Sequence, residues 1–292
     1  MKTSICAIII SYNCDEKILS GINIIRNQVD YVVIVDNGSN ERSIDILKEI
    51  TNVDLKIIYN SRNMGIACAL NQGVKYAKDN KFDWVITLDQ DSLATEDIIE
   101  NMLNVYKSLD EDQKTRVVSL VPEHIEEKFY TKKRDTSNPL KFEETLADVT
   151  SGNLVKTSLF DKVGYFDEKL FIDYVDHEFC LRICKNGYKI LKVDNSILLH
   201  NLGDYQFKKI FSRKIYYTNH SFTRRYYITR NRLYVWNLYK EDFSLWVRRD
   251  KKDAIKEIFK ILLFEDNKFL KLKMIFKGYN DFKNHKYGEL NL

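Results

Sequence analysis

Two carboxylates one residue apart, Asp89 and Asp91, lie in the stretch TLDQDS directly after the apolar run FDWVI. A buried strand does not tolerate an unpaired charge, so these side chains must lie just outside the strand or hold a cation. A polar turn is the simplest interpretation of a lone Asp-x-Asp. The alternative is a site for Mg²⁺ or Mn²⁺, which prefer carboxylate oxygens and would bind a diphosphate there.

The first 120 residues alternate near-continuous Val and Ile runs with amphipathic segments. This pattern predicts an α/β fold with a mostly parallel, Rossmann-like sheet covered by helices on both faces. Ligands of such sheets bind outside the carboxyl ends of the strands. Asp36, Asn60 and Asp89 each end a predicted strand, so we expect them at the same edge. The predicted strands are 4–10, 31–36, 55–60, 83–89 and 116–121, and the predicted helices include 15–28, 65–80 and 95–108.

Later segments are less regular. Residues 122–146 are polar and aperiodic, which predicts a loop or insertion over the sheet edge. A helix is expected from Asp176 to Asn186, ending at Gly187, a favourable residue after a helix. Strand alternation would turn Asp89 and Asp91 to the same side, with Gln90 pointing away.

Charge divides the chain into two parts. Residues 207–292 contain 21 Lys and Arg against 9 Asp and Glu, whereas residues 1–206 contain 25 against 33. We therefore expect two domains, 1–206 around the sheet and 207–292 as a basic, aromatic-rich helical extension. The odd number of dispersed cysteines predicts free thiols in a reducing, cytoplasmic compartment.

The sequence lacks the motifs that are typical of several enzyme classes. The first strand is not followed by G-x-G-x-x-G, and G-x-x-x-x-G-K-[ST] and G-x-S-x-G are absent. His177-Glu178 is not followed by a histidine at Leu181, which excludes the H-E-x-x-H metalloprotease helix. A dinucleotide dehydrogenase, a P-loop enzyme and an α/β-hydrolase are accordingly disfavoured. A polar set at strand ends remains, in which Asp36 could accept a base N–H and Tyr12 could stack on the ring.

The order of these polar segments along the chain resembles that of the family 2 glycosyltransferases with GT-A architecture. The matching segments are SYN (11–13), DNGS (36–39), NSRNMG (60–65), ALNQG (69–73) and LDQDS (88–92). GIACALNQGVKYA and WVITLDQDS are especially similar to the bacterial rhamnosyltransferase branch. The likeness extends over about residues 4–235.

The resemblance implies roles for individual residues. In FIDYVDHEFCLR, it makes Asp176 the general base, with Asp173 and Glu178 as alternatives. Asp89 and Asp91 would bind the ribose and a Mg²⁺ or Mn²⁺ ion, with His200 completing the metal site. The nucleotide-sugar pocket would comprise Ser11, Tyr12, Asn13, Asp36, Asn37, Asn63, Gly65, Asn71, Asp89, Gln90 and Asp91.

The expected function is an inverting, metal-dependent sugar transfer from a nucleoside diphosphate sugar to a surface glycan or lipid-linked acceptor. The donor is a dTDP- or UDP-sugar, with dTDP-rhamnose as the specific expectation. An inverting transfer needs one base for the acceptor hydroxyl and a cation for the departing diphosphate. Two alternatives stay open: a non-catalytic sugar-nucleotide-binding subunit of a glycan assembly complex, and a nucleotidyltransferase.

The basic C-terminal region mixes cations with aromatic residues, as in FTRRYYITRNRLYVW. Three interpretations compete: peripheral contact with the inner face of the cell membrane, binding of an acidic or lipid-diphosphate acceptor, and a solvated helical cap. A nucleic-acid groove is disfavoured, so no nucleic-acid partner is expected.

Overall fold

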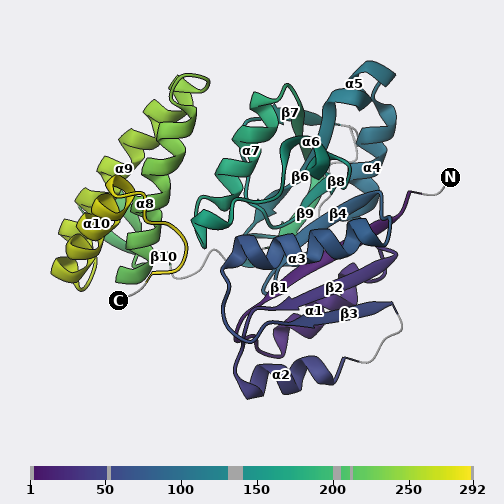
Figure 1. The fold of residues 1–292 in the computed structure, drawn as a ribbon, viewed down its shortest axis with the longest axis horizontal. Coiled ribbons are helices and arrows are strands. Elements are labelled where there is room, and N and C mark those ends of the chain that lie inside the picture. The colour runs from purple at the N-terminus through teal and green to yellow at the C-terminus, as the bar shows by residue number, and fades with distance from the viewer. Residues whose placement is uncertain (1–2, 51–53, 131–140, 200–204, 211–212, 291–292) are drawn as a thin grey trace. The chain divides into compact units, whose positions relative to one another are not determined.

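The computed structural model describes residues 3–50, 54–130, 141–199, 205–210 and 213–290. The chain divides into two compact units (Figure 1). The sheet unit comprises Met1–Glu168 and Val175–Asn201, and the helical unit comprises Lys169–Tyr174 and Leu202–Leu292.

One large sheet organises the sheet unit. Its strands are β1 (Ile5–Ser11), β2 (Tyr31–Asp36), β3 (Leu55–Tyr59), β4 (Trp84–Asp89), β5 (Leu93–Ala94), β6 (Val117–Ile125), β7 (Phe142–Thr145), β8 (Asn153–Lys156) and β9 (Lys189–Leu199). They are ordered β3-β2-β1-β4-β8-β6-β9-β5, with β7 also beside β9. All of these strands except β5, β7 and β8 run in the same direction. The predicted mostly parallel α/β sheet is confirmed.

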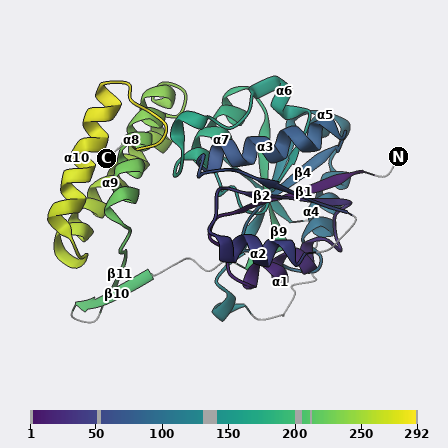
Figure 2. The same ribbon diagram turned by 60° about the horizontal axis from the view of Figure 1, so that its bottom comes forward.

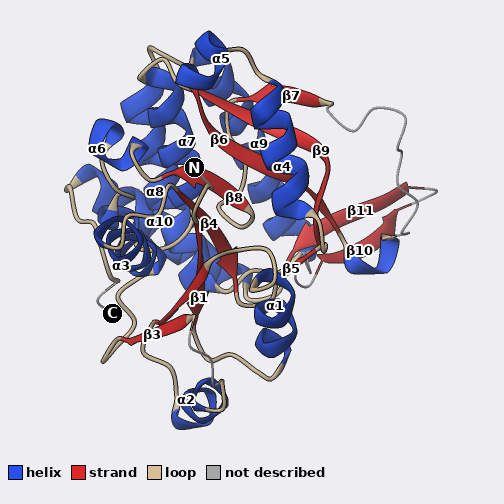
Figure 3. Ribbon diagram, turned by 90° about the vertical axis from the view of Figure 1, so that its right-hand side faces the viewer, coloured by secondary structure: helices blue, strands red, loops and turns tan. Residues whose placement is uncertain are grey.

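Helices cover both faces of this sheet (Figure 3). Odd-numbered residues of β1, such as Ile5 and Ile9, join one core with three helices, whereas Ile8 on the opposite face lies against Gly73. This alternation is the two-residue period of a strand buried on both sides. On the first face lie α1 (Lys17–Ile25), α2 (Glu41–Lys48) and α4 (Ile98–Ser108), while α3 (Ile66–Asp79), α6 (Leu159–Val163) and α7 (Val175–Lys185) lie on the second. The short helix α5 (Glu111–Arg116) leads into β6.

The predicted loop over 122–146 is wrong at both ends. β6 continues through the buried Pro122 to Ile125, and β7 pairs with β9. Pro122 is tolerated because the pairing of β6 with β9 shifts register between Val121 and Glu123, and a bulge leaves room for a residue without an N–H. Antiparallel β8 separates β4 from β6.

The helical unit consists of a hairpin and three helices (Figure 2). The hairpin pairs β10 (Tyr205–Ile210) with β11 (Arg213–Thr218), and the helices are α8 (Phe222–Tyr239), α9 (Ser244–Phe264) and α10 (Lys268–Lys283). Tyr226, Tyr227 and Met274 form a small core between α8 and α10. In the part of the chain described, no helix is both long enough and apolar enough to cross a bilayer.

Close packing of α3 on β1 generates the first prediction. A Cβ at Gly73 would lie 2.3 Å from Cγ2 of Ile8, so alanine forces the helix away from the strand. Overpacking costs about 1–3 kcal/mol, against a gain of about 1 kcal/mol in helix propensity. We expect Gly73→Ala to lower the free energy of unfolding by about 1 kcal/mol in urea titrations. Lys75→Ala, at an exposed position of the same helix, should leave it within about 0.5 kcal/mol.

Candidate functional site

The carboxyl ends of three neighbouring strands form the candidate site. Ser11 at the end of β1 pairs in register with Asp36 at the end of β2, and Ile10 pairs with Asp89 at the end of β4. Asp36 in turn lies opposite Tyr59, the last residue of β3. The prediction that these strand ends share one edge is confirmed.

Two side chains at this edge, Ser11 and Asp36, bring oxygen atoms into a buried position. Ser11 and Asp36 are 0% and 1% exposed. Asp36 Oδ2 accepts a hydrogen bond from the Ser39 amide at 3.2 Å. Ser11 Oγ and Asp36 Oδ1, by contrast, have no hydrogen-bond partner among the residues that the structure describes. Because an unpaired buried polar group costs about 1–3 kcal/mol, these atoms are poised to bind a ligand.

Asparagine side chains hold the loops around this edge. Asn37 Oδ1 accepts hydrogen bonds from the Met64 amide at 2.9 Å and from Asn60 Nδ2 at 3.2 Å. Asn37 Nδ2 donates to Asn63 Oδ1 at 3.1 Å, which also accepts from the Gly65 amide at 2.9 Å. Asn37, Asn63 and Gly65 were all predicted as pocket residues, and their mutual bonds fix the loop after β3 against the end of β2.

A second brace joins the loop after β1 to the Asp-x-Asp turn. Gln90 accepts from the Tyr12 amide at 2.7 Å and donates to the Tyr12 carbonyl at 3.2 Å. The Tyr12 side chain remains 45% exposed, so one flat ring is available for stacking. The Asn13 amide donates to Ser39 Oγ at 2.8 Å, which fixes this loop against the one after β2.

β4 ends at Asp89, and residues 90–91 form a turn. The strand alternation invoked for Asp91 therefore does not reach it, because the extended backbone has already ended. The Asp89 amide donates to Ser151 Oγ at 3.0 Å, and Ser92 Oγ lies 2.8 Å from the same hydroxyl. Asp91 is exposed.

Ser151 is a site-supporting residue that the sequence prediction missed. It is 3% exposed, and its carbonyl bonds to His124 Nε2 at 2.9 Å. The neighbouring Gly152 amide donates to the Thr87 carbonyl at 2.6 Å. The signal in the sequence is the short polar run TSGN (150–153), which leads into β8. Its contact with the Asp-x-Asp turn depends on sheet pairing across more than 60 residues.

Asn71, another predicted pocket residue, lies away from this set of bonds. It is 2% exposed, and its Nδ2 donates to the Phe166 carbonyl at 3.0 Å and to Glu168 Oε1 at 2.8 Å. The Phe166 amide donates back to Asn71 Oδ1 at 2.9 Å. These bonds tie α3 to the segment before α7.

Three acids near the start of α7 lie in different surroundings. Glu178 is 3% exposed and accepts two hydrogen bonds from Arg182, at 2.8 and 3.0 Å. Asp173, in the helical unit, pairs with Arg224 at 3.0 Å. Asp176 is half-buried, and its Oδ1 accepts from the His177 amide at 2.8 Å. Of the three, Asp176 is the carboxylate with no ion pair among the described residues.

Metal ligands are sparse at this edge. Among the described residues, no group of three or more His, Cys, Asp or Glu side chains could hold an ion by itself. His200, the predicted third ligand, lies outside the described residues. Mg²⁺ is commonly held by one or two carboxylates and completed by substrate phosphates, so Asp89 and Asp91 fit the protein share of such a site.

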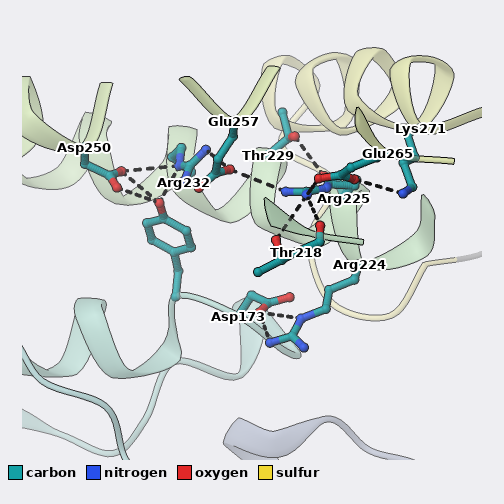
Figure 4. Close-up of polar contacts among 11 residues, drawn as sticks. Asp173, Thr218, Arg224, Arg225, Thr229, Arg232, Asp250, Glu257, Glu265 and Lys271 are labelled. Carbon is teal, nitrogen blue, oxygen red and sulfur yellow. Dashed lines mark hydrogen bonds and ion pairs between the residues drawn. The ribbon is translucent and has the colours of Figure 1, made fainter. Parts of the chain in front are cut away.

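The segment of the helical unit that precedes α7 has an unusual backbone. Phe171, Asp173 and Tyr174 all have left-handed φ angles, between 62° and 66°. Such residues cost about 1–3 kcal/mol each unless their surroundings hold them. The side-chain amide of Asn231 on α8 donates from Nδ2 to three backbone carbonyls of this segment, at 2.7–2.9 Å. Arg224 adds the ion pair to Asp173 (Figure 4).

Family membership is shown by comparison with known proteins. The sequence profile described as Glycosyl transferase family 2 matches residues 6–166. The chain belongs to this family, and it is a glycosyltransferase.

Two relatives and one solved structure illustrate the likeness. The dTDP-rhamnosyl transferase RfbF of Shigella flexneri is 32% identical over 244 residues, which are 79% of each chain. The uncharacterized glycosyltransferase MJ1057 of Methanocaldococcus jannaschii is 25% identical over 82% of this chain and 86% of its own. A crystal structure of GalNAc-T7 with UDP, GalNAc and Mn²⁺ has a TM-score of 0.61 at 15% identity, covering 97% of this chain and 56% of that one. The predicted GT-A fold is confirmed.

His220 generates a prediction about pH. Burial, followed by the charges of Arg224 and Arg225, lowers the pKa of His220 from 6.5 to about 4, and Lys271 acts in the same direction against Glu257. The folded state therefore binds this proton less readily than the unfolded state. Protonation of His220 therefore destabilises the fold: the free energy of unfolding is unaffected by this group above pH 6.5 and falls as the pH drops towards 4. The loss is on the order of 2 kcal/mol.

We expect the melting temperature to fall between pH 6.5 and pH 4, and to fall less steeply in His220→Asn. Circular dichroism melts across that range measure both slopes. His285→Asn, at an exposed position of the same unit, should retain the wild-type slope. Equal slopes in His220→Asn and wild type would contradict the assignment.

Proposed function

We propose that the sheet unit binds a nucleoside diphosphate sugar at the carboxyl ends of β1, β2 and β4 and transfers the sugar with inversion. The expected donor is dTDP-rhamnose, and the expected acceptor is a surface glycan or a lipid-linked glycan. Family membership and the 32% identity to a dTDP-rhamnosyl transferase support this choice. The observation that carries it is the pair of buried oxygens of Ser11 and Asp36, which have no hydrogen-bond partner in the described part of the chain.

Base recognition follows from the chemistry of these atoms. A thymine or uracil ring carries one N–H donor, which Asp36 Oδ1 can accept in a charge-assisted hydrogen bond. Ser11 Oγ can donate to, or accept from, the base or ribose. The exposed ring of Tyr12 supplies a stacking surface, and Gln90 holds the backbone of that residue in place.

The diphosphate would lie beside Asp89 and Asp91, which would hold Mg²⁺ or Mn²⁺. When bound, the ion stabilises negative charge on the departing nucleoside diphosphate. Ser151 Oγ accepts a hydrogen bond from the Asp89 amide and so braces the start of the turn that presents both carboxylates. The Mn²⁺ in the GalNAc-T7 structure is consistent with this chemistry.

Asp176 would act as the general base. Its carboxylate takes the proton of the acceptor hydroxyl as the oxygen attacks the anomeric carbon, and the bond from that carbon to the diphosphate oxygen breaks. A half-buried carboxylate with one oxygen held by the His177 amide is oriented but still accessible. Glu178 is engaged by Arg182 and Asp173 by Arg224, which leaves Asp176 as the favoured base.

The main competing function is a non-catalytic subunit that binds the sugar nucleotide within a glycan assembly complex. Both functions predict that dTDP raises the melting temperature. Only the transferase predicts release of dTDP from dTDP-rhamnose in the presence of Mn²⁺. A thermal-shift panel of nucleotide sugars, followed by turnover of those that bind, separates the two.

Asp36→Ala should weaken dTDP binding by about 10- to 100-fold, because a hydrogen bond to a charged group contributes about 1.5–3 kcal/mol. Isothermal titration calorimetry measures the Kd. Asp45→Ala, on the exposed face of α2, should bind dTDP like the wild type. An unchanged Kd in Asp36→Ala would place the base elsewhere.

Asp176→Asn should lower kcat by about 10²- to 10⁴-fold, because amide nitrogen cannot accept the hydroxyl proton. Release of dTDP measures the rate, and the Kd for dTDP should stay within about threefold of wild type, since Asp176 is not one of the residues proposed to hold the base. Asp79→Asn, at the exposed end of α3, is the matched control. Wild-type turnover in Asp176→Asn would move the base role to another residue.

A further inference from the structure

The helical unit exposes apolar side chains in organised rows. On α9, Ile255, Phe259 and Leu262 are 56%, 59% and 42% exposed, and their spacing places them on one helix face. On α10, Phe269 and Phe276 are 84% and 64% exposed and lie seven residues apart. Single exposed apolar residues need no explanation, but rows on two helices of one small unit indicate a binding surface.

A cavity of about 360 Å³ opens in the same surface, between α8, α9 and α10. Ile258, Phe276 and Tyr279 line this cavity and are themselves exposed, and Phe276 connects the α10 row to the cavity. Arg232 and Glu257 also line it, and they pair with each other at 3.0 Å. The surface is therefore apolar with a neutralised charge pair.

The charged side chains of α9 differ in whether they bond within the helical unit or lie at its surface. Its Asp250 accepts hydrogen bonds from the Tyr174 hydroxyl at 2.8 Å and from Trp236 Nε1 at 2.7 Å. Its Glu257 pairs with Arg232 of α8 (Figure 4). These two acids are thus neutralised inside the unit. A third acid, Asp253, lies at the surface and pairs with the exposed Lys256 at 2.7 Å. Four further basic side chains of the helix are exposed: Arg248, Arg249, Lys251 and Lys252.

We propose that this face of α9 and α10 docks on an anionic lipid bilayer. The exposed phenylalanine and aliphatic side chains enter the acyl-chain boundary, and the Arg and Lys side chains contact anionic headgroups. A second copy of the chain would bring the same cations together, whereas an anionic lipid surface complements them. The proposal uses residues of the helical unit alone and does not rest on the proposed function.

The test is co-sedimentation of the full chain with vesicles, without sugar nucleotide. Vesicles of phosphatidylcholine alone are compared with vesicles containing about 30% phosphatidylglycerol, at low and high salt. We expect binding to the anionic vesicles that weakens with salt, and at least about tenfold weaker binding to phosphatidylcholine alone.

Two variants separate the apolar and electrostatic parts. The triple variant Phe259→Gln, Phe269→Gln, Phe276→Gln keeps every charge and should lower the ratio of bound to free protein at least about tenfold. The triple variant Arg248→Gln, Lys251→Gln, Lys252→Gln should lose most of the salt dependence. The matched control Phe142→Gln, Leu146→Gln, Val149→Gln changes three exposed apolar residues of the sheet unit and should bind like the wild type.

Melting temperatures of all variants should stay close to wild type, because the altered side chains are exposed. Wild-type vesicle binding by the phenylalanine variant, or no binding of the wild type to anionic vesicles, would overturn the proposal. So would a stable dimer in light scattering that the phenylalanine variant abolishes, because a second copy would then cover this face.

Discussion

Parallel pairing of β1 with β2 and β4 is the constraint on which the site depends. A strand buried on both faces excludes charge along its length, so carboxylates can enter only where the strand ends. Parallel register brings those ends together: Ser11 lies beside Asp36, and Asp89 lies one residue away on the other neighbour. The site is therefore assembled by the same hydrogen bonds that hold the sheet, before any loop contributes to it.

This constraint explains why much of the site could be predicted from the sequence. The Val and Ile runs predict the strands, and the sequence shows directly which polar residue follows each run. What could not be read is how the edge is reinforced. Ser151 supports the Asp-x-Asp turn only because the four-residue strand β8 pairs with β4, and so short a strand carries too little pattern to be recognised.

In the helical unit, by contrast, the sequence pattern does not predict which residues are buried. Apolar residues at positions 255, 259 and 262 have the spacing of a buried stripe, yet they are exposed, whereas Ile261 is 1% exposed. Helical periodicity identifies faces but not their partners, since burial depends on which helices pack together. Similarly, the sequence of α9 does not show that Asp250 and Glu257 bond to other residues of the helical unit. The contacts with Tyr174, Trp236 and Arg232 show that these two acids are used inside the unit, and the surface of the helix keeps one acid, Asp253, against an excess of exposed Arg and Lys.

The acids around the start of α7 show how surroundings assign roles within one short motif. FIDYVDHEF places three carboxylates within six residues, and their intrinsic chemistry is nearly the same. Glu178 is buried and forms an ion pair with Arg182, whereas Asp173 holds a left-handed backbone segment through its ion pair with Arg224. A general base must instead be oriented yet reachable by a substrate hydroxyl. We propose Asp176 for this role because it is half-buried, the amide of His177 holds one of its oxygens, and the other two acids of the motif are engaged in ion pairs.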